Sequence, residues 1–297
     1  MDIKVLFGID METDVGSFTP FYEGVQKATP MLLELFAKKG VKGTFYFTGH
    51  AAKNNPKSVK MVYETDNEVG CHSLYHETVG DPLFDIPGVM PLLTEEVPLR
   101  LKRATEWVEE VSGVRPVSFR CPRLWGSTTV IKVLEDLGYT SDATYPMYYY
   151  RNQFAPYHPS RDNWTQKGDM RILEIPNFAD MVMKSNDPHL ERDRDQWPIY
   201  RTENAETLME RVVSFITFLH QKKLPVVLCF YFHPWEFIPC KTQYMFGEGG
   251  SCVQEFLVKG CGEKAKLEFS KLIDSLKVMD ARFVTAADLA GDFFEQY

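Results

Sequence analysis

The feature that most constrains the fold is a repeated alternation of short apolar runs with amphipathic segments. Residues 3–9 form an apolar, β-rich run, and a pattern with helical spacing follows at 22–39, where Gly40 marks its end. The cycle recurs, with further strands expected at 41–49, 68–72, 116–122, 139–143, 171–176 and 225–232, and further helices at 52–65, 94–113, 127–138, 205–222 and 263–278. This rhythm predicts an α/β protein with a mostly parallel sheet, and about seven or eight strands favour a closed or nearly closed barrel.

One region departs from this rhythm. Residues 144–202 are rich in Tyr, Pro, Asn, Asp and Arg, and only the run at 171–176 resembles a strand. That is more irregular chain than a compact domain usually carries, which indicates rim or binding structure rather than a linker. Because no linker or internal repeat divides the 297 residues, we predict a single domain spanning residues 1–297.

Charge and apolar content exclude some classes of partner. The chain carries 33 Lys and Arg against 41 Asp and Glu, which argues against a nucleic-acid or anionic-membrane surface. The longest apolar run, at 224–232, has about half the length that a bilayer span requires. The first strand, with acidic residues before and after it, fits neither a secretory signal nor a transit peptide. We therefore expect a soluble, cytoplasmic protein with no membrane span.

Two histidines four residues apart stand in the stretch NEVGCHSLYHETVG at 67–80. On one helical turn, the β-carbons of His72 and His76 would lie about 5–6 Å apart, a spacing at which two imidazoles can share a metal ion. The 7 histidines of the chain give more than one chance for such a coincidence. On spacing alone, two ordinary surface or packed imidazoles are therefore the favoured interpretation.

Ionisable residues stand at the ends of five expected strands, where a parallel β/α barrel gathers its reactive groups. They are Asp10 and Glu12 after the first strand, His72 and His76 after the third, Arg120 at the fourth, Asp142 at the fifth, and His233 after the run at 226–232. Strand ends are polar in any case because turns begin there, which accounts for any one of these residues. It accounts less well for the histidine pair together with His233. Two imidazoles and one carboxylate suit a metal site with a position open for water, and a further carboxylate and histidine suit a general base and acid.

These segments resemble, in order, the motifs of the polysaccharide deacetylases, the NodB-homology domain of carbohydrate esterase family 4. The similar stretches are FGIDMETD at 7–14, GTFYFTG at 43–49, HSLYH at 72–76, FRCPRLWG at 119–126, SDATY at 141–145 and FYFHPWEF at 230–237. Each motif is weak alone, but together, in the family's order, they are specific. The resemblance implies a distorted (β/α) barrel of the NodB deacetylase type and metal-dependent hydrolysis of an acyl amide.

The resemblance also implies a metal site and a substrate pocket. Its metal ligands would be Glu12, His72 and His76. The cofactor would be a divalent ion, with zinc favoured, although iron, cobalt and manganese accept the same ligands. Trp125 and Trp235 stand beside motif residues and are candidate walls of the pocket, the alternative being that they only pack its rim.

The same resemblance implies roles in the reaction. Asp10 would be the general base and Arg120 would orient and tune it. His233 would be the general acid and Asp142 would tune it. These roles belong to the family's motifs and stay predictions for the present residues.

The first motif departs from the usual family pattern. Most of the family places two aspartates side by side, whereas this chain reads Asp10-Met11-Glu12. That spacing is similar to the intracellular branch, which includes peptidoglycan-deacetylase-like proteins, formamido-arabinose deformylases and metal-independent allantoinases. It argues against a polymeric cell-wall substrate and, by analogy with that branch, leaves a homo-oligomer open.

We therefore predict a hydrolase of non-peptide carbon–nitrogen bonds. Its partner would be a small-molecule or saccharide substrate, from which it removes an acetyl or formyl group, and not a nucleic acid. One alternative is a metal-independent, allantoinase-like amidohydrolase. Another is a non-catalytic binding protein on the same barrel, which is disfavoured because the predicted base, ligands, arginine and acid are all present.

Overall fold

The computed structural model describes residues 2–86, 88–187 and 189–294. Its strands are β1 (Ile3–Met11), β2 (Thr44–Phe47), β3 (Glu68–Cys71), β4 (Ser118–Phe119), β5 (Ser141–Asp142), β6 (Leu173–Glu174), β7 (Val226–Phe232), β8 (Gln243–Phe246), β9 (Gly249–Cys252) and β10 (Arg282–Phe283). Its α-helices are α1 (Glu23–Lys39), α2 (Gly49–Asn54), α3 (Pro56–Tyr63), α4 (Val97–Ser112), α5 (Thr128–Asp136), α6 (Met147–Tyr150), α7 (Ile199–Thr202), α8 (Ala205–Gln221), α9 (Glu255–Val258), α10 (Glu263–Val278) and α11 (Ala286–Phe294). Short 3-10 turns are η1 (Thr94–Glu96), η2 (Pro122–Leu124), η3 (Arg192–Arg194) and η4 (Pro234–Phe237).

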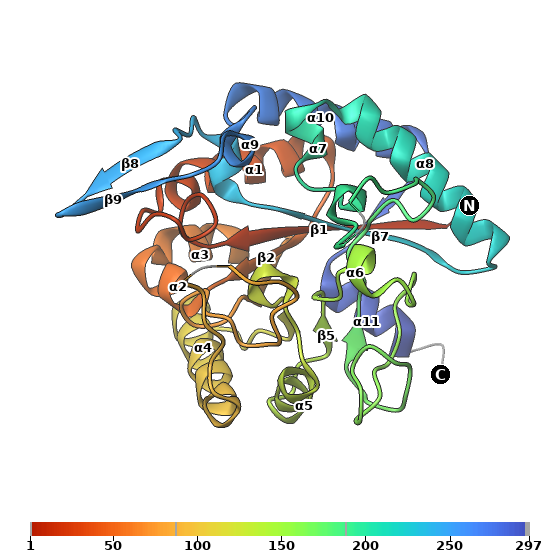
Figure 1. Cartoon of the computed structure of the whole chain (residues 1–297), viewed down its shortest axis with the longest axis horizontal. Helices are drawn as coiled ribbons and strands as arrows, with labels where there is room; N and C mark the ends of the chain where they lie inside the picture. Colours follow the sequence, from red (N-terminus) through yellow and green to blue (C-terminus); the bar gives the residue numbers. More distant parts are fainter. Residues whose placement is uncertain (1, 87, 188, 295–297) are drawn as a thin grey trace.

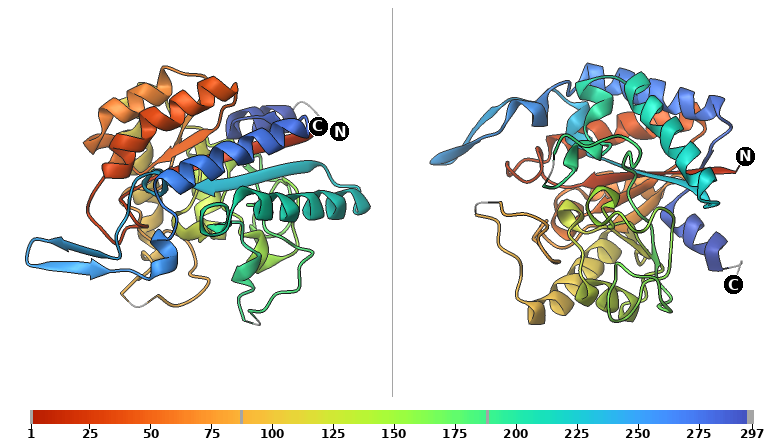
Figure 2. Two further views of the ribbon diagram at one scale, coloured as in Figure 1. Left: turned by 90° about the horizontal axis from the view of Figure 1, so that it is seen from above. Right: turned by 45° about the vertical axis from the view of Figure 1, so that its right-hand side comes forward.

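The main sheet is parallel and curls around an interior (Figures 1 and 2). β1 pairs with β7 along one side, and with β2 and β10 along the other. From β2 the sheet continues in chain order to β6. Just beyond β6, Asn177 forms a parallel bridge with Cys229 of β7, so the strands follow a nearly closed path. The predicted (β/α) barrel is therefore confirmed.

Alternate side chains of β1 point to opposite faces of the sheet. Phe7 and Ile9 pack in the core beneath the helices. Leu6 lies on the other face and packs with Leu289 of α11. Because side chains alternate along the strand, Asp10 lies on the same face as Leu6. The helix α11 thus fills the amino-terminal end of the interior, and the carboxyl ends of the strands surround its open end.

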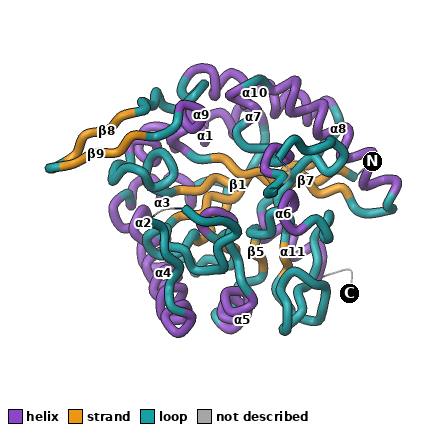
Figure 3. The backbone as a smooth tube through the Cα atoms, viewed as in Figure 1, coloured by secondary structure: helices purple, strands orange, loops and turns teal. Residues whose placement is uncertain are grey.

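Helices cover the outside of the barrel. α8 and α10 lie on one side of β1 and β7, while α4 and α5 lie on the other (Figure 1). The hairpin β8–β9 projects from the body (Figures 1 and 2), and long loops connect many of the elements (Figure 3). Within the described ranges, no helix is long and apolar enough to cross a membrane.

Some boundaries differ from the sequence prediction. The helix expected at 52–65 is two helices, because Pro56 disfavours helical geometry in Asn55 before it (φ −131°, ψ 53°). The helix expected at 94–113 starts only at Val97, because Thr94–Glu96 form the 3-10 turn η1. β1 continues through Met11, which places Asp10 within the strand.

Candidate functional site

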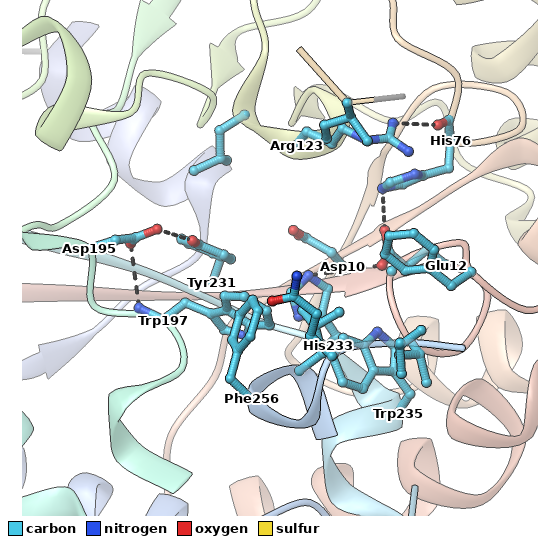
Figure 4. Close-up of a pocket in the computed structure, with 18 of the residues that line it drawn as sticks. Asp10, Glu12, His76, Arg123, Asp195, Trp197, Tyr231, His233, Trp235 and Phe256 are labelled. Carbon is cyan, nitrogen blue, oxygen red and sulfur yellow. Dashed lines mark hydrogen bonds and ion pairs between the residues drawn. The ribbon is translucent and has the colours of Figure 1, made fainter. Parts of the chain in front are cut away.

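The carboxyl ends of β1, β3 and β7 open into a cavity of about 510 Å³ (Figure 4). The predicted site residues that line it are Asp10, Glu12, His72, His76, His233 and Trp235. Apolar side chains from two loops and from the segment that leads into and includes α9 complete much of the wall, namely Val15 and Phe18, Phe84, Ile86 and Val89, and Val253, Phe256 and Leu257. Polar groups from three separate strand ends therefore meet at the base of a largely apolar chamber.

Glu12, His72 and His76 form a buried cluster whose possible ligand atoms all lie within 4.8 Å of one another. Glu12 Oε2 contacts His76 Nε2 and lies 3.5 Å from His72 Nε2. The expected helical turn is wrong, because the histidines lie in the loop after β3, where Ser73 and His76 have φ values of 66° and 64°. This left-handed loop turns both imidazoles toward Glu12.

Hydrogen bonds at the far side of each ring orient the two imidazoles. His72 Nδ1 lies 2.7 Å from the carbonyl oxygen of Arg120, and His76 Nδ1 lies 2.7 Å from Ser17 Oγ. The carbonyl can only accept, so Nδ1 of His72 carries a proton and Nε2 is the atom left to bind a metal. The serine oxygen allows the same tautomer for His76. Both Nε2 atoms then converge on Glu12, which is the outer-shell arrangement of metal-binding histidines.

Glu12 is held as a carboxylate. Burial raises its pKa, but His76 and His72 outweigh that effect, so the pKa lies well below its ordinary value. Neither carboxylate oxygen accepts a conventional hydrogen bond from the part of the chain that the structure describes. One carboxylate and two imidazoles offer the ligand atoms of a divalent-metal site, so these residues suit the ion that the sequence predicts.

Arg120 lies inside the barrel behind Asp10. Its side chain is fully buried, and Nη1 donates to Asp10 Oδ1 at 2.9 Å while Nε donates to the carbonyl oxygen of Ala143. Gly8 makes this possible, because a β-carbon there would collide with the guanidinium. The ion pair fixes the position of the Asp10 carboxylate, which lines the cavity where a base would stand.

Glu236, which the sequence prediction did not include, holds His233. Its Oε1 accepts from the backbone N–H of His233 and lies 2.9 Å from Nδ1 of the same residue. Burial raises the pKa of Glu236, but Arg201 and His233 lower it to about 2. Burial also opposes a charged His233, yet the bond to Glu236 raises its pKa above the ordinary value. His233 is therefore held toward its protonated form, with Nε2 directed at the Glu12 side of the cavity.

The structure does not bring Asp142 to His233. Asp142 instead accepts from Thr144 Oγ1 at 2.6 Å and hydrogen bonds to Glu174. Burial raises the pKa of Asp142 to about 7. Burial and the nearby charge of Asp142 raise the pKa of Glu174 well above its ordinary value, because two buried carboxyl groups in contact cannot both ionise. Asp142 and Glu174 therefore form a proton-sharing pair, and the contact expected of Asp142 belongs to Glu236.

The two tryptophans differ in position. Trp235 lines the cavity and stacks on His233, with ring centroids 5.1 Å apart. Trp125 is outside the cavity lining and packs edge-on against Phe84, with ring centroids 5.2 Å apart. Trp235 thus supports the candidate acid, whereas Trp125 stands behind the wall that it was expected to form.

The sequence prediction also missed polar groups in the irregular segment. Asp195 is buried beside the cavity, accepts from the hydroxyl of Tyr231, and has its pKa raised by burial to about 6. Trp197 stands edge-on to His233. The composition of 144–202 indicated a binding role for this segment, but no spacing within it identified these residues.

Comparison with known proteins finds similarity to one family over part of the chain. The sequence model described as polysaccharide deacetylase matches residues 15–141. The chain is 29% identical over 112 residues to the peptidoglycan-N-acetylmuramic acid deacetylase of Bacillus subtilis, a match covering 37% of this chain and 39% of that protein. It is 26% identical over 179 residues to a peptidoglycan deacetylase of Helicobacter pylori, covering 56% of each chain. Residues 15–141 are thus similar to the polysaccharide deacetylase family, and the chain spans from two fifths to little more than half of the length of these relatives.

Solved structures share the fold. A Mycobacterium smegmatis protein assigned to the polysaccharide deacetylases superposes with a TM-score of 0.64 at 18% identity, covering 99% of this chain and 91% of the other. The allantoinase PuuE superposes with a TM-score of 0.60 at 17% identity, covering 97% and 89% of the two chains. Both likenesses concern the barrel, because sequence identity at this level shows the fold alone.

Proposed function

We propose that this protein is a metal-dependent hydrolase that removes an acetyl or formyl group from a small N-acyl compound. The observation that carries the proposal is the convergence of the Nε2 atoms of His72 and His76 on the charged Glu12. The family supports an amide-hydrolysing activity. A divalent ion, with zinc favoured, would supply Lewis-acid polarisation of the acyl oxygen and lower the pKa of water.

The protein's own residues supply the proton transfers in this proposal. Asp10, held in place by Arg120, removes a proton from the attacking water. His233, held protonated by Glu236, donates a proton to the nitrogen that leaves as the amine. Water adds to the acyl carbon and the carbon–nitrogen bond breaks, giving a carboxylic acid and an amine. The two groups thus act in opposite directions on protons, and each is held by a buried partner.

The cavity favours a compact substrate. Its volume of about 510 Å³ falls within the range of small-molecule pockets, and its loops enclose the ligand cluster. We therefore propose an amino sugar or another small amide rather than a polymer, in keeping with the predicted cytoplasmic location.

The test begins with elemental analysis of the purified protein, followed by hydrolysis assays on N-acetyl and N-formyl compounds with and without a chelator. We expect about one divalent ion per chain and loss of turnover on chelation. Alanine at His72 or His76 should remove both the ion and the activity, whereas His220→Ala, at an exposed end of α8, should change neither.

The other outcomes decide between the alternatives. Full turnover by protein free of metal would establish the metal-independent, allantoinase-like hydrolase. A bound ion without hydrolysis of any N-acyl compound would instead favour the binding protein.

A further inference from the structure

Two arginines line the cavity without a carboxylate at salt-bridge distance among the described residues. Arg123 uses Nη1 to donate to the carbonyl oxygen of His76 at 3.3 Å. Its other guanidinium nitrogens form no hydrogen bond with the part of the chain that the structure describes. Its side chain is half-buried. A partly desolvated guanidinium with free N–H groups in a cavity is ready to accept an anion.

Arg192 belongs to η3 and is far from Arg123 in sequence. Both guanidinium groups nevertheless lie over rings of one aromatic pair, Phe84 and Trp125. Its guanidinium lies over the ring of Phe84 at 5.1 Å, and Phe84 packs against Trp125. Arg123 lies over Trp125 at 5.8 Å. The two adjacent rings therefore bring two cations to one side of the chamber, Arg123 beside the ligand loop and the exposed Arg192 farther out.

Asp195, an acidic residue that also lines the cavity, leaves Arg192 available. Asp195 attracts Arg192 electrostatically, but its carboxylate accepts from the Tyr231 hydroxyl and from the backbone N–H of Trp197 at 3.4 Å. Arg192 is not in ion-pair contact with it or with any other described residue.

The backbone holds Arg123 in an unfavourable conformation. Arg123 and Leu124 both have φ of 59°, a left-handed region that few residues other than glycine adopt. Consecutive residues in this region cost free energy and persist where the surrounding structure imposes them, which is commonly at ligand sites. Here the turn directs Arg123 toward His76 at the cavity (Figure 4).

We infer that the substrate carries an anionic group, a carboxylate or a phosphate, which Arg123 and Arg192 bind while the amide lies beside Glu12, His72 and His76. This inference rests on the proposed function and narrows its substrate class to small, acidic N-acyl compounds. The aromatic wall shields the anion from water, which strengthens its attraction to the two guanidinium groups.

The test measures anion binding separately from catalysis. The full chain, both metal-loaded and metal-free, is titrated with succinate and with inorganic phosphate, following the fluorescence of Trp197 and Trp235 in the cavity. We expect Arg123→Gln to weaken binding about 100-fold and Arg192→Gln about tenfold, with Arg123→Lys in between because lysine keeps the charge but loses the planar fork. The control is Arg103→Gln, an exposed arginine on α4 that should leave binding unchanged.

The outcomes are separable from those of the proposed function. Preference for succinate over phosphate, or the reverse, identifies the anion. Binding unchanged in both glutamine variants, or lost on metal removal but not on arginine substitution, would overturn the inference, because the anion would then sit elsewhere or on the metal. Since Arg123 also supports the His76 loop, metal content is measured in parallel, and Arg192→Gln tests the site without touching that loop. Absence of hydrolysis would count against the proposed function but leave a measured anion site standing.

Discussion

Two fully buried arginines stand behind the cavity, and each holds a carboxylate, but the two pairs face different neighbours. Arg120 pairs with Asp10, whose carboxylate lines the cavity. Arg201 pairs with Glu236, whose carboxylate bonds to His233. In the first pair the carboxylate itself faces the cavity, whereas in the second the carboxylate hydrogen bonds to an imidazole that faces the cavity.

The difference shows how the same arginine–carboxylate pair can support a general base in one place and a general acid in another. A charged carboxylate open to the cavity can take up a proton. A carboxylate bonded to His233 raises the pKa of that imidazole and keeps a proton available for donation. Removing either carboxylate, or Arg201, tests whether the two ion pairs differ in this way.

Removal of the cavity carboxylate should have the largest effect. Asp10→Asn keeps the shape and an oxygen for Arg120 but cannot accept a proton, so we expect kcat/KM to fall about 10²- to 10⁴-fold. Metal content, measured by elemental analysis, should stay unchanged, because the predicted ligands are Glu12, His72 and His76. Unchanged kcat/KM in a metal-loaded D10N protein would show that Asp10 is not the base.

Removal of an arginine should act on stability. Arg201→Met leaves Glu236 buried and without its cation, and breaks bonds to the carbonyl oxygens of Lys259 and Leu257 at 2.6 and 2.8 Å. We expect the free energy of unfolding, measured with urea, to fall by about 3–5 kcal/mol.

Two further variants check this explanation. Adding Glu236→Gln to Arg201→Met should recover part of the loss, because the unpaired charge disappears. Arg115→Met removes a half-exposed pair with Glu109 and should cost less than about 1 kcal/mol. A loss of that small size at Arg201 would mean that the buried pair contributes little.

The third change concerns the alkaline side of the pH profile. As general acid, His233 must be protonated, so activity falls as pH rises through its pKa. Glu236→Gln removes the negative charge at Nδ1 and lowers that pKa, so the alkaline limb of kcat/KM should move to lower pH by on the order of one unit. The matched control is Asp142→Asn, which should leave this limb in place; a shift in D142N instead of E236Q would restore the role that the sequence predicted for Asp142.

The sequence predicted the site residues well where they stand at the ends of strands. The alternation of apolar runs predicted the parallel barrel, and the polar residues after β1, β3 and β7 are those that the structure gathers at the cavity. Strand ends are set by local pattern, and the topology of a parallel barrel then places them together without further information.

The partners within the barrel were harder to predict, because they depend on distances that no local pattern encodes. Glu236 stands only three residues after His233, so its place in FYFHPWEF was a usable signal. Arg201 lies in the irregular segment, 35 residues before Glu236, and no sequence signal pointed to it. The left-handed loop at His72 and His76 was also missed, because positive φ at Ser73 and His76 is rare for residues other than glycine.

The smallest expected effect is on the pH dependence of stability. It tests whether Asp142, unlike the charged Glu236, holds a proton in the folded protein. Burial raises the pKa of Asp142 to about 7, above the value of about 3.9 for an unfolded aspartate. The folded state therefore binds the proton more tightly, and the stability from this group is complete below about pH 4 and lost as pH rises through about 7. Asp142→Asn removes this titration, so the free energy of unfolding of the variant relative to the parent should rise by on the order of 2 kcal/mol between pH 5 and pH 8. Urea unfolding at both pH values measures it, with the exposed Asp136→Asn as control. A difference that stays flat with pH would mean that Asp142 is ionised in the folded protein, and the contrast with the charged Glu236 would then fail.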